Sequence, residues 1–146
     1  MYIKIDGNQM LPTFDYTITI LNKLKASDSS TRQDVWYKTV VKNCAFSKSN
    51  KTNISGNTVS SGALFTIRVP KSENYLPYSK WINGPDGYFT FSGGDYVVKG
   101  EIDEIPTSSN ILTIYNKYRE NACKITFIKD NTGTIECMEH YRIEGV

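Results

Sequence analysis

Residues 88–101, YFTFSGGDYVVKGE, form the stretch that decides the fold class predicted for this chain. Aromatic and β-branched residues lie on both sides of two adjacent glycines, and such residues suit the pleated, packed surface of a sheet. Gly93 and Gly94 can take the positive φ angles of a tight turn, and Asp95 can bond its side chain to the nearby backbone. The stretch therefore predicts a β-hairpin whose turn is made by Gly93, Gly94 and Asp95.

A hairpin has to bury its apolar face against other strands, and the rest of the sequence supplies candidates. Runs of aromatic and β-branched residues predict strands at 2–5, 16–21, 33–43, 63–69, 123–128 and 134–143. Only 107–118 has apolar residues at helical spacing, with Thr107, Ser108 or Ser109 as its cap. We therefore expect a mainly β fold, a small antiparallel β-barrel or sandwich of about seven to nine strands with one α-helix near 107–118.

The length of 146 residues suits a single domain with its own hydrophobic core. We expect one barrel-like domain over 1–146, with an N-terminal extension at about 1–15. Two long loops are expected, at about 46–62 and 70–88. The first is rich in Ser, Asn and Thr and predicts an extended, mobile hairpin, whereas the second carries several aromatic residues.

Composition excludes several classes of protein. With 39% hydrophobic and 22% charged residues, the chain has neither a disordered nor a membrane composition. No apolar run approaches the ~20 residues needed to cross a bilayer, and no secretory signal is visible, so we expect no membrane partner. Cys44, Cys123 and Cys137 are widely spaced and odd in number, which predicts buried free thiols in a reducing compartment rather than a disulfide.

A search for catalytic chemistry finds little. His140 is the single histidine, and on a predicted strand it is more typical of a surface or packing residue than of a general base or metal ligand. Glu101, Asp103 and Glu104 stand in a row that is more typical of a solvated strand exit than of a glycosidase pair. Because no nucleophile, phosphate-binding loop or metal-ligand set appears, we expect no enzyme, no catalytic residue, no metal and no cofactor.

Two binding features remain. Lys48 and Lys51, in the first loop, are candidates for contact with a phosphate backbone. Tyr75, Tyr78 and Trp81, in the second loop, can stack on sugars or contact a protein partner, and they can equally cap one end of the barrel. The residues alone leave both alternatives open.

Four segments carry a resemblance to a known family: YKTVVKNC at 37–44, IRVP at 67–70, GDYVVKG at 94–100 and EHYRIEG at 139–145. Their order resembles that of small minor structural proteins encoded in the head-to-tail region of tailed phages and prophages of Gram-positive bacteria. The similarity covers the chain from about Tyr16 onward, and residues 1–15 have no match. It implies a neck component of the head-completion, stopper or adaptor type, built on a small β-barrel and assembled as a ring between portal and tail.

The resemblance also implies partners and a location. The partners are further copies of the chain in a ring of about six or twelve, neighbouring portal, adaptor and tail proteins, and packaged DNA by non-specific contact. Under this reading Lys48 and Lys51 lie at the channel or between rings, and Tyr75, Tyr78 and Trp81 lie between subunits. The location is the virion, assembled in the host cytoplasm. Alternatives are a tail terminator or other tail-associated virion protein, and a carbohydrate-binding β module.

Overall fold

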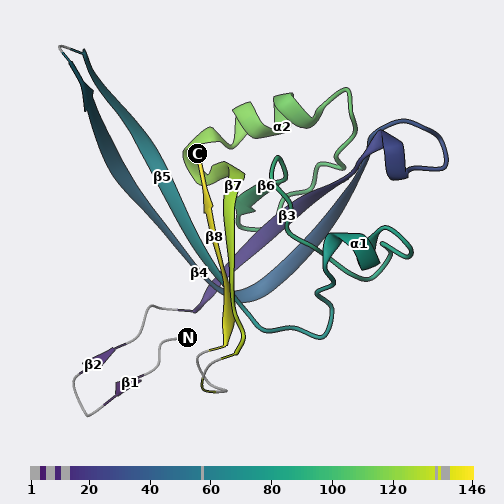
Figure 1. The fold of residues 1–146 in the computed structure, drawn as a ribbon, viewed down its shortest axis with the longest axis horizontal. Helices are drawn as coiled ribbons and strands as arrows, with labels where there is room; N and C mark the ends of the chain where they lie inside the picture. The colour runs from purple at the N-terminus through teal and green to yellow at the C-terminus, as the bar shows by residue number, and fades with distance from the viewer. Residues whose placement is uncertain (1–3, 6–8, 11–13, 57, 134, 136–138) are drawn as a thin grey trace.

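The computed structural model describes residues 4–5, 9–10, 14–56, 58–133, 135 and 139–146, with the backbone alone described at 4–5, 9–10, 51–55 and 58–61. Six strands close into an antiparallel barrel in the order β3–β4–β5–β8–β7–β6 (Figure 1). The predicted mainly β fold with a small antiparallel barrel is therefore confirmed. The predicted count of seven to nine strands is not confirmed, because the barrel has six and, within the described residues, the short β1 and β2 pair only with each other.

The elements follow one another along the chain as β1 (Lys4–Ile5), β2 (Gln9–Met10), β3 (Tyr16–Leu24), β4 (Val35–Ser55), β5 (Thr58–Pro70), α1 (Tyr78–Trp81), β6 (Tyr96–Lys99), α2 (Ile111–Lys117), β7 (Ala122–Asn131) and β8 (His140–Gly145). Short 3-10 turns occur at η1 (Ala26–Asp28) and η2 (Arg119–Asn121). Pro70 ends β5 as predicted, because proline has no N–H to donate to a further partner.

The hairpin predicted at 88–101 is wrong, although its turn is present. β6 pairs with β3 on one side and with β7 on the other, so neither edge is left for residues 88–91. Phe89 and Phe91 are buried in the main core instead. Gly94 has φ +94°, and Asp95 N–H donates to the Ser92 carbonyl over 3.1 Å, which closes the predicted tight turn.

The two glycines of this turn are expected to differ in their tolerance of a side chain. Gly94 lies in the left-handed region, whereas Gly93 does not, and a Cβ at either position meets no atom within 4 Å. We expect Gly94→Ala to lower the free energy of unfolding by about 1–2 kcal/mol through backbone strain. Gly93→Ala is the matched control and should change it by less than about 0.5 kcal/mol. Denaturant titration measures both, and equal losses would contradict the assigned turn.

The core has two parts. The barrel interior holds the larger cluster, in which alternate residues of β8 such as Tyr141 and Ile143 point inward while their neighbours point outward. The second cluster lies between the barrel wall and α2, where Ile111 and Ile114 pack against residues of β3 and β6 such as Leu21 and Val98. The barrel is therefore packed inside and covered by α2 on one side (Figure 1).

The helix predicted near 107–118 is present but shorter, and its predicted caps are wrong. It begins after Asn110, and none of Thr107, Ser108 and Ser109 makes a side-chain cap. The Thr107 N–H instead donates to Asn110 Oδ1 over 2.6 Å. A second helix that was not predicted, α1, makes a single turn within the expected loop at 70–88.

Two of the three cysteines are free and buried, as predicted. Burial raises the pKa of both the Cys44 and the Cys123 thiol to about 12, so neither forms a thiolate near neutral pH. Cys137 lies outside the described residues.

Candidate functional site

The longest projection of the molecule is the hairpin that β4 and β5 make beyond the barrel wall, at the upper left of Figure 1. We call residues 45–64 the arm. β3 pairs with β4 no further than Cys44, opposite Tyr16, and β8 pairs with β5 no further than Phe65, opposite Gly145. In the described part of the chain, residues 49–55 and 58–64 therefore pair only with each other, whereas residues 45–48 pair with residues 65–68 of the barrel wall. A hairpin is present at 46–62 as predicted, but the long loop expected there is wrong, because β4 and β5 run through this segment as regularly paired strands.

The arm presents open strand edges to its surroundings. At about 3.3 Å per residue, the open edge of β4 from Ala45 to Ser55 extends for about 33 Å, and that of β5 from Thr58 to Leu64 extends for about 20 Å. Both outer edges carry backbone N–H and C=O groups that are available to another strand. An isolated two-stranded hairpin is marginally stable in water, so the arm gains most by contact with a neighbouring chain.

The structure changes the role expected of the arm lysines. Lys48 pairs with Phe65, whose ring centroid lies 5.4 Å from Lys48 Nζ, and Nζ lies 3.3 Å from Oε2 of Glu120. Residues 45–64 contain no acidic residue, so this neutralising carboxylate could not be foreseen from the arm sequence. The backbone of Lys51 pairs with Gly62, and its side chain lies outside the described set. The ion pair with Glu120 makes Lys48 a weaker candidate for phosphate contact.

Aromatic and cationic side chains fix the base of the arm to the barrel. The rings of Phe46 and Phe65 meet edge to face with centroids 5.6 Å apart. Lys99 Nζ lies 4.4 Å from the ring centroid of Tyr16 and 5.8 Å from that of Phe46. These contacts join the arm to β3 and β6, so the direction in which it leaves the barrel is set by packing.

Trp81 is removed from the candidate interface residues. Its side chain is fully buried, and its ring centroid lies 5.5 Å from that of Tyr37 and 5.9 Å from that of Tyr78. A buried indole offers no face to a sugar or to a second subunit. Tyr78 is half-buried, and its hydroxyl donates to Asp28 Oδ2 over 2.8 Å, which ties α1 to the turn after β3.

Tyr75 contributes to the end of the barrel core. It is half-buried, and its ring centroid lies 4.2 Å from that of Tyr141 and 5.6 Å from that of Phe91, both of which are buried. Tyr75 and Trp81 thus follow the alternative in which the aromatic residues cap the barrel. The carbohydrate-binding alternative loses its main stacking residue as a consequence.

The carboxylate of Asp95 is enclosed beneath its turn. It is 1% exposed and accepts hydrogen bonds from Asn22 Nδ2 over 2.9 Å and from the Lys23 N–H over 3.1 Å. Asn22 Nδ2 also donates to the backbone carbonyl of Thr90, and the backbone N–H of Thr90 donates to Asn22 Oδ1. Burial raises the pKa of Asp95 to about 6, and the hydrogen bonds oppose this only in part. The group connects the turn to β3 and is not open to a ligand.

A row of cations crosses the outer face of the barrel where β5, β8 and β7 run side by side. Arg142 of β8 lies directly opposite Arg68 of β5 and directly opposite Lys129 of β7. Residues of β5 and β8 on either side of this level are buried, so the arginines point outward. We call Arg68, Arg142 and Lys129 the cationic row.

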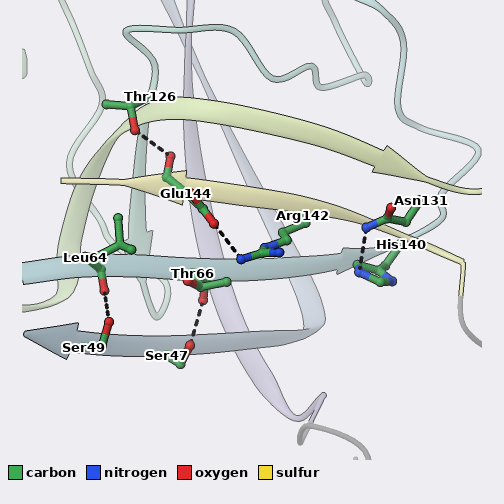
Figure 2. A network of polar contacts seen from close by, with 9 residues as sticks. All are labelled: Ser47, Ser49, Leu64, Thr66, Thr126, Asn131, His140, Arg142 and Glu144. Atoms are coloured by element: carbon green, nitrogen blue, oxygen red, sulfur yellow. Dashed lines mark hydrogen bonds and ion pairs between the residues drawn. The ribbon is translucent and has the colours of Figure 1, made fainter. Parts of the chain in front are cut away.

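Figure 2 shows the polar surroundings of Arg142 on this face. Its guanidinium Nη2 lies 2.6 Å from Oε1 of Glu144, which is the one ion pair formed by the row among the described residues. Ser47 Oγ donates to the Thr66 carbonyl over 3.3 Å, and Thr126 Oγ1 donates to the Glu144 carbonyl over 3.3 Å. The face is therefore polar and carries an excess of positive charge.

Sequence reasoning missed the cationic row. Each member stands at an outward position of its own strand, but the three are far apart in the chain. The available signal was the presence of basic residues within or next to three predicted strands, and only the register shows that three of them align.

His140 and the carboxylates near 101–104 form no evident catalytic group. His140 lies opposite Asn131, with Nε2 3.3 Å from Asn131 Nδ2. Glu104 accepts hydrogen bonds from Lys117 and Tyr118, which lower its pKa to about 2 and keep it ionised. Glu101 and Asp103 are exposed. Among the residues that the structure describes, no group of three or more His, Cys, Asp and Glu side chains is placed to hold a metal ion.

Within the described residues, no helix has the length and apolar character needed to span a membrane.

Fold and surface together define a small closed β-barrel protein with a long projecting arm. The chain belongs to DUF6751, a family of unknown function, whose model matches residues 13–146. No curated protein and no solved structure matches it.

Proposed function

We propose that this protein is a structural component of the neck of a tailed phage, of the head-completion, stopper or adaptor type. In this role it forms a homo-oligomeric ring between portal and tail in the virion. The observation that carries the proposal is the arm, a regular hairpin whose outer edges, about 33 Å long on β4 and about 20 Å long on β5, have no partner strand in the described chain.

A projecting arm suits ring formation because it makes an asymmetric contact. The arm of one copy lies on the next copy, while its own barrel receives the arm of the copy before it. Such head-to-tail contacts close into a ring when the rotation between copies divides a full turn. Strand edges add a source of affinity that depends on the backbone, because main-chain hydrogen bonds extend a sheet across two chains.

The barrel and the arm divide the work in this proposal. The wall of the barrel is closed, which removes strand edges and gives each subunit a stable body. The arm carries the open edges and is fixed at its base by Phe46 and Lys99. A shortened arm should therefore affect assembly and leave folding intact.

The test removes residues 50–53 together with 60–63. These residues pair with one another, from Asn50 opposite Ala63 to Asn53 opposite Ser60, so the shortened hairpin keeps its register and its turn. Because an even number of residues is deleted from each strand, every remaining side chain stays on the same face of the hairpin. We expect the variant to keep the melting temperature of the barrel within a few degrees and to remain monomeric. The wild-type protein should form a ring, about 100 kDa for six copies of the 16.5-kDa chain.

Light scattering coupled to size exclusion measures the mass. The matched control is Ser49→Thr with Asn50→Thr, which changes two exposed side chains of the arm and keeps its length. It should assemble like wild type if the backbone edge carries the contact. A shortened variant that still forms rings would contradict the role of the arm, and a monomeric wild-type protein would contradict the ring. A tail terminator also forms a ring, and co-assembly with purified portal or purified tails separates the two.

A further inference from the structure

The cationic row lowers the stability of the fold through repulsion between like charges. Arg68, Arg142 and Lys129 occupy directly opposed positions on three neighbouring strands. Like charges at such positions are destabilising. Glu144 offsets Arg142, with Nη2 and Oε1 2.6 Å apart, but Arg68 and Lys129 have no ion pair among the described residues. The face thus holds two uncompensated cations, one on each side of a compensated one.

The spacing of the row fits a regular polyanion. Neighbouring strands lie about 4.8 Å apart, so the row is about 10 Å long. Duplex DNA carries one negative charge per about 3.4 Å of its axis on each strand, so about three phosphates of one strand lie along that length. A straight row on the outside of a barrel can lie along a phosphate backbone without a pocket. The hydroxyls of Ser47 and Thr126 flank the row, and both donate to backbone carbonyls of the sheet.

We propose that the outer face of β5, β8 and β7 binds the phosphate backbone of duplex DNA through the cationic row, without sequence preference. Arg68 and Lys129 supply the free charges, and Arg142 holds the centre of the row. The site differs from Lys48 and Lys51, the residues expected from the sequence, because Lys48 is already paired with Glu120. The inference does not depend on ring formation.

The experiment compares wild type with the double variant Arg68→Ala, Lys129→Ala. Binding to a fluorescein-labelled duplex is followed by anisotropy at 50 mM and 200 mM salt. We expect a wild-type Kd of about 10⁻⁴–10⁻⁶ M at physiological salt and a loss of at least tenfold in the double variant. The slope of log K against log salt should fall by about 2, since two phosphate contacts are lost.

The matched control is Arg32→Ala, Lys80→Ala, which removes the same two residue types from exposed positions near the turn after β3 and in α1. It should keep most of the wild-type affinity. The double variant relieves like-charge opposition, so its melting temperature should equal or exceed that of wild type and lost binding will not reflect unfolding.

Absence of DNA binding by wild type would overturn the inference, as would equal losses in the two double variants. Binding of poly-glutamate without any binding of DNA would also overturn it and would assign the row to an acidic protein segment. Light scattering on the same samples keeps the proposals separate. A monomer that binds DNA through Arg68 and Lys129 would support DNA binding by the cationic row and contradict ring formation. A ring that does not bind DNA would support ring formation and contradict DNA binding by the cationic row.

Discussion

Replacement of Gly145 by alanine is expected to lower the free energy of unfolding by about 3 kcal/mol. A Cβ at Gly145 would lie 2.6 Å from the Lys124 carbonyl oxygen and 2.8 Å from Cys123 Sγ. Gly145 pairs with both Phe65 and Ile125, next to the register shift in β7, so the backbone around it is held from two sides. A carbonyl oxygen in a paired strand cannot swing aside as a side chain can, and the strands would have to separate.

Gly62→Ala is the control for this effect. Gly62 also lies in a strand, has no left-handed φ, and has no atom within 4 Å of the position of a new Cβ. Its substitution should change stability by less than about 0.5 kcal/mol. Urea denaturation followed by tryptophan fluorescence measures both variants. Comparable stability of the two would show that β7 and β8 approach less closely than described.

The second large effect concerns Asp95 and pH. Relative to Asp95→Asn, the wild-type protein is expected to lose about 2 kcal/mol of stability as pH rises from 4 to 7. The pKa of Asp95 is raised from 3.8 to about 6 by burial. Between these two values the unfolded chain releases its proton more readily than the folded chain, so rising pH favours unfolding. Above about pH 6 both states are ionised, and the loss levels off.

The comparison with Asp95→Asn isolates this group, because every other titrating residue is common to both proteins. The asparagine side chain has one acceptor oxygen where the carboxylate has two, so the variant loses one of the bonds from Asn22 Nδ2 and the Lys23 N–H, a loss that does not depend on pH. Denaturation midpoints at half-unit steps of pH measure the difference. A difference that stays constant from pH 4 to 7 would show that Asp95 ionises in the fold as it does in the unfolded chain.

Much of the fold follows from local sequence. The alternation at 63–69 and the stop at Pro70 give the end of β5, and Gly56, with φ +60°, marks the tip of the arm. The prediction of a hairpin at 88–101 failed because a run of aromatic residues has the same local pattern in a strand as in a buried loop. Partner choice decides between them, and both edges of β6 are taken by strands that lie far away in the sequence.

The candidate sites were less predictable, because they depend on register. The cationic row exists only because Arg68, Arg142 and Lys129 meet at one level of three strands. The pairing of Lys48 with Glu120 depends on how the arm leans toward the turn after α2. The residue type suggested that Trp81 contacts a ligand or partner. Its burial depends on packing against distant residues such as Tyr37, which the local sequence does not indicate.

The barrel can close only late in synthesis, because β8, the last strand of the chain, lies between β5 and β7 in the barrel. The barrel cannot close before residues 140–145 have emerged, whereas the arm joins neighbours in sequence and can form early, since local contacts form fastest. A nascent chain therefore displays the open arm edges before it has a closed body. Newly made copies on one messenger can meet through these edges prematurely, and the many Ser, Asn and Thr residues at 45–64, together with Lys48 and Lys51, oppose such early association.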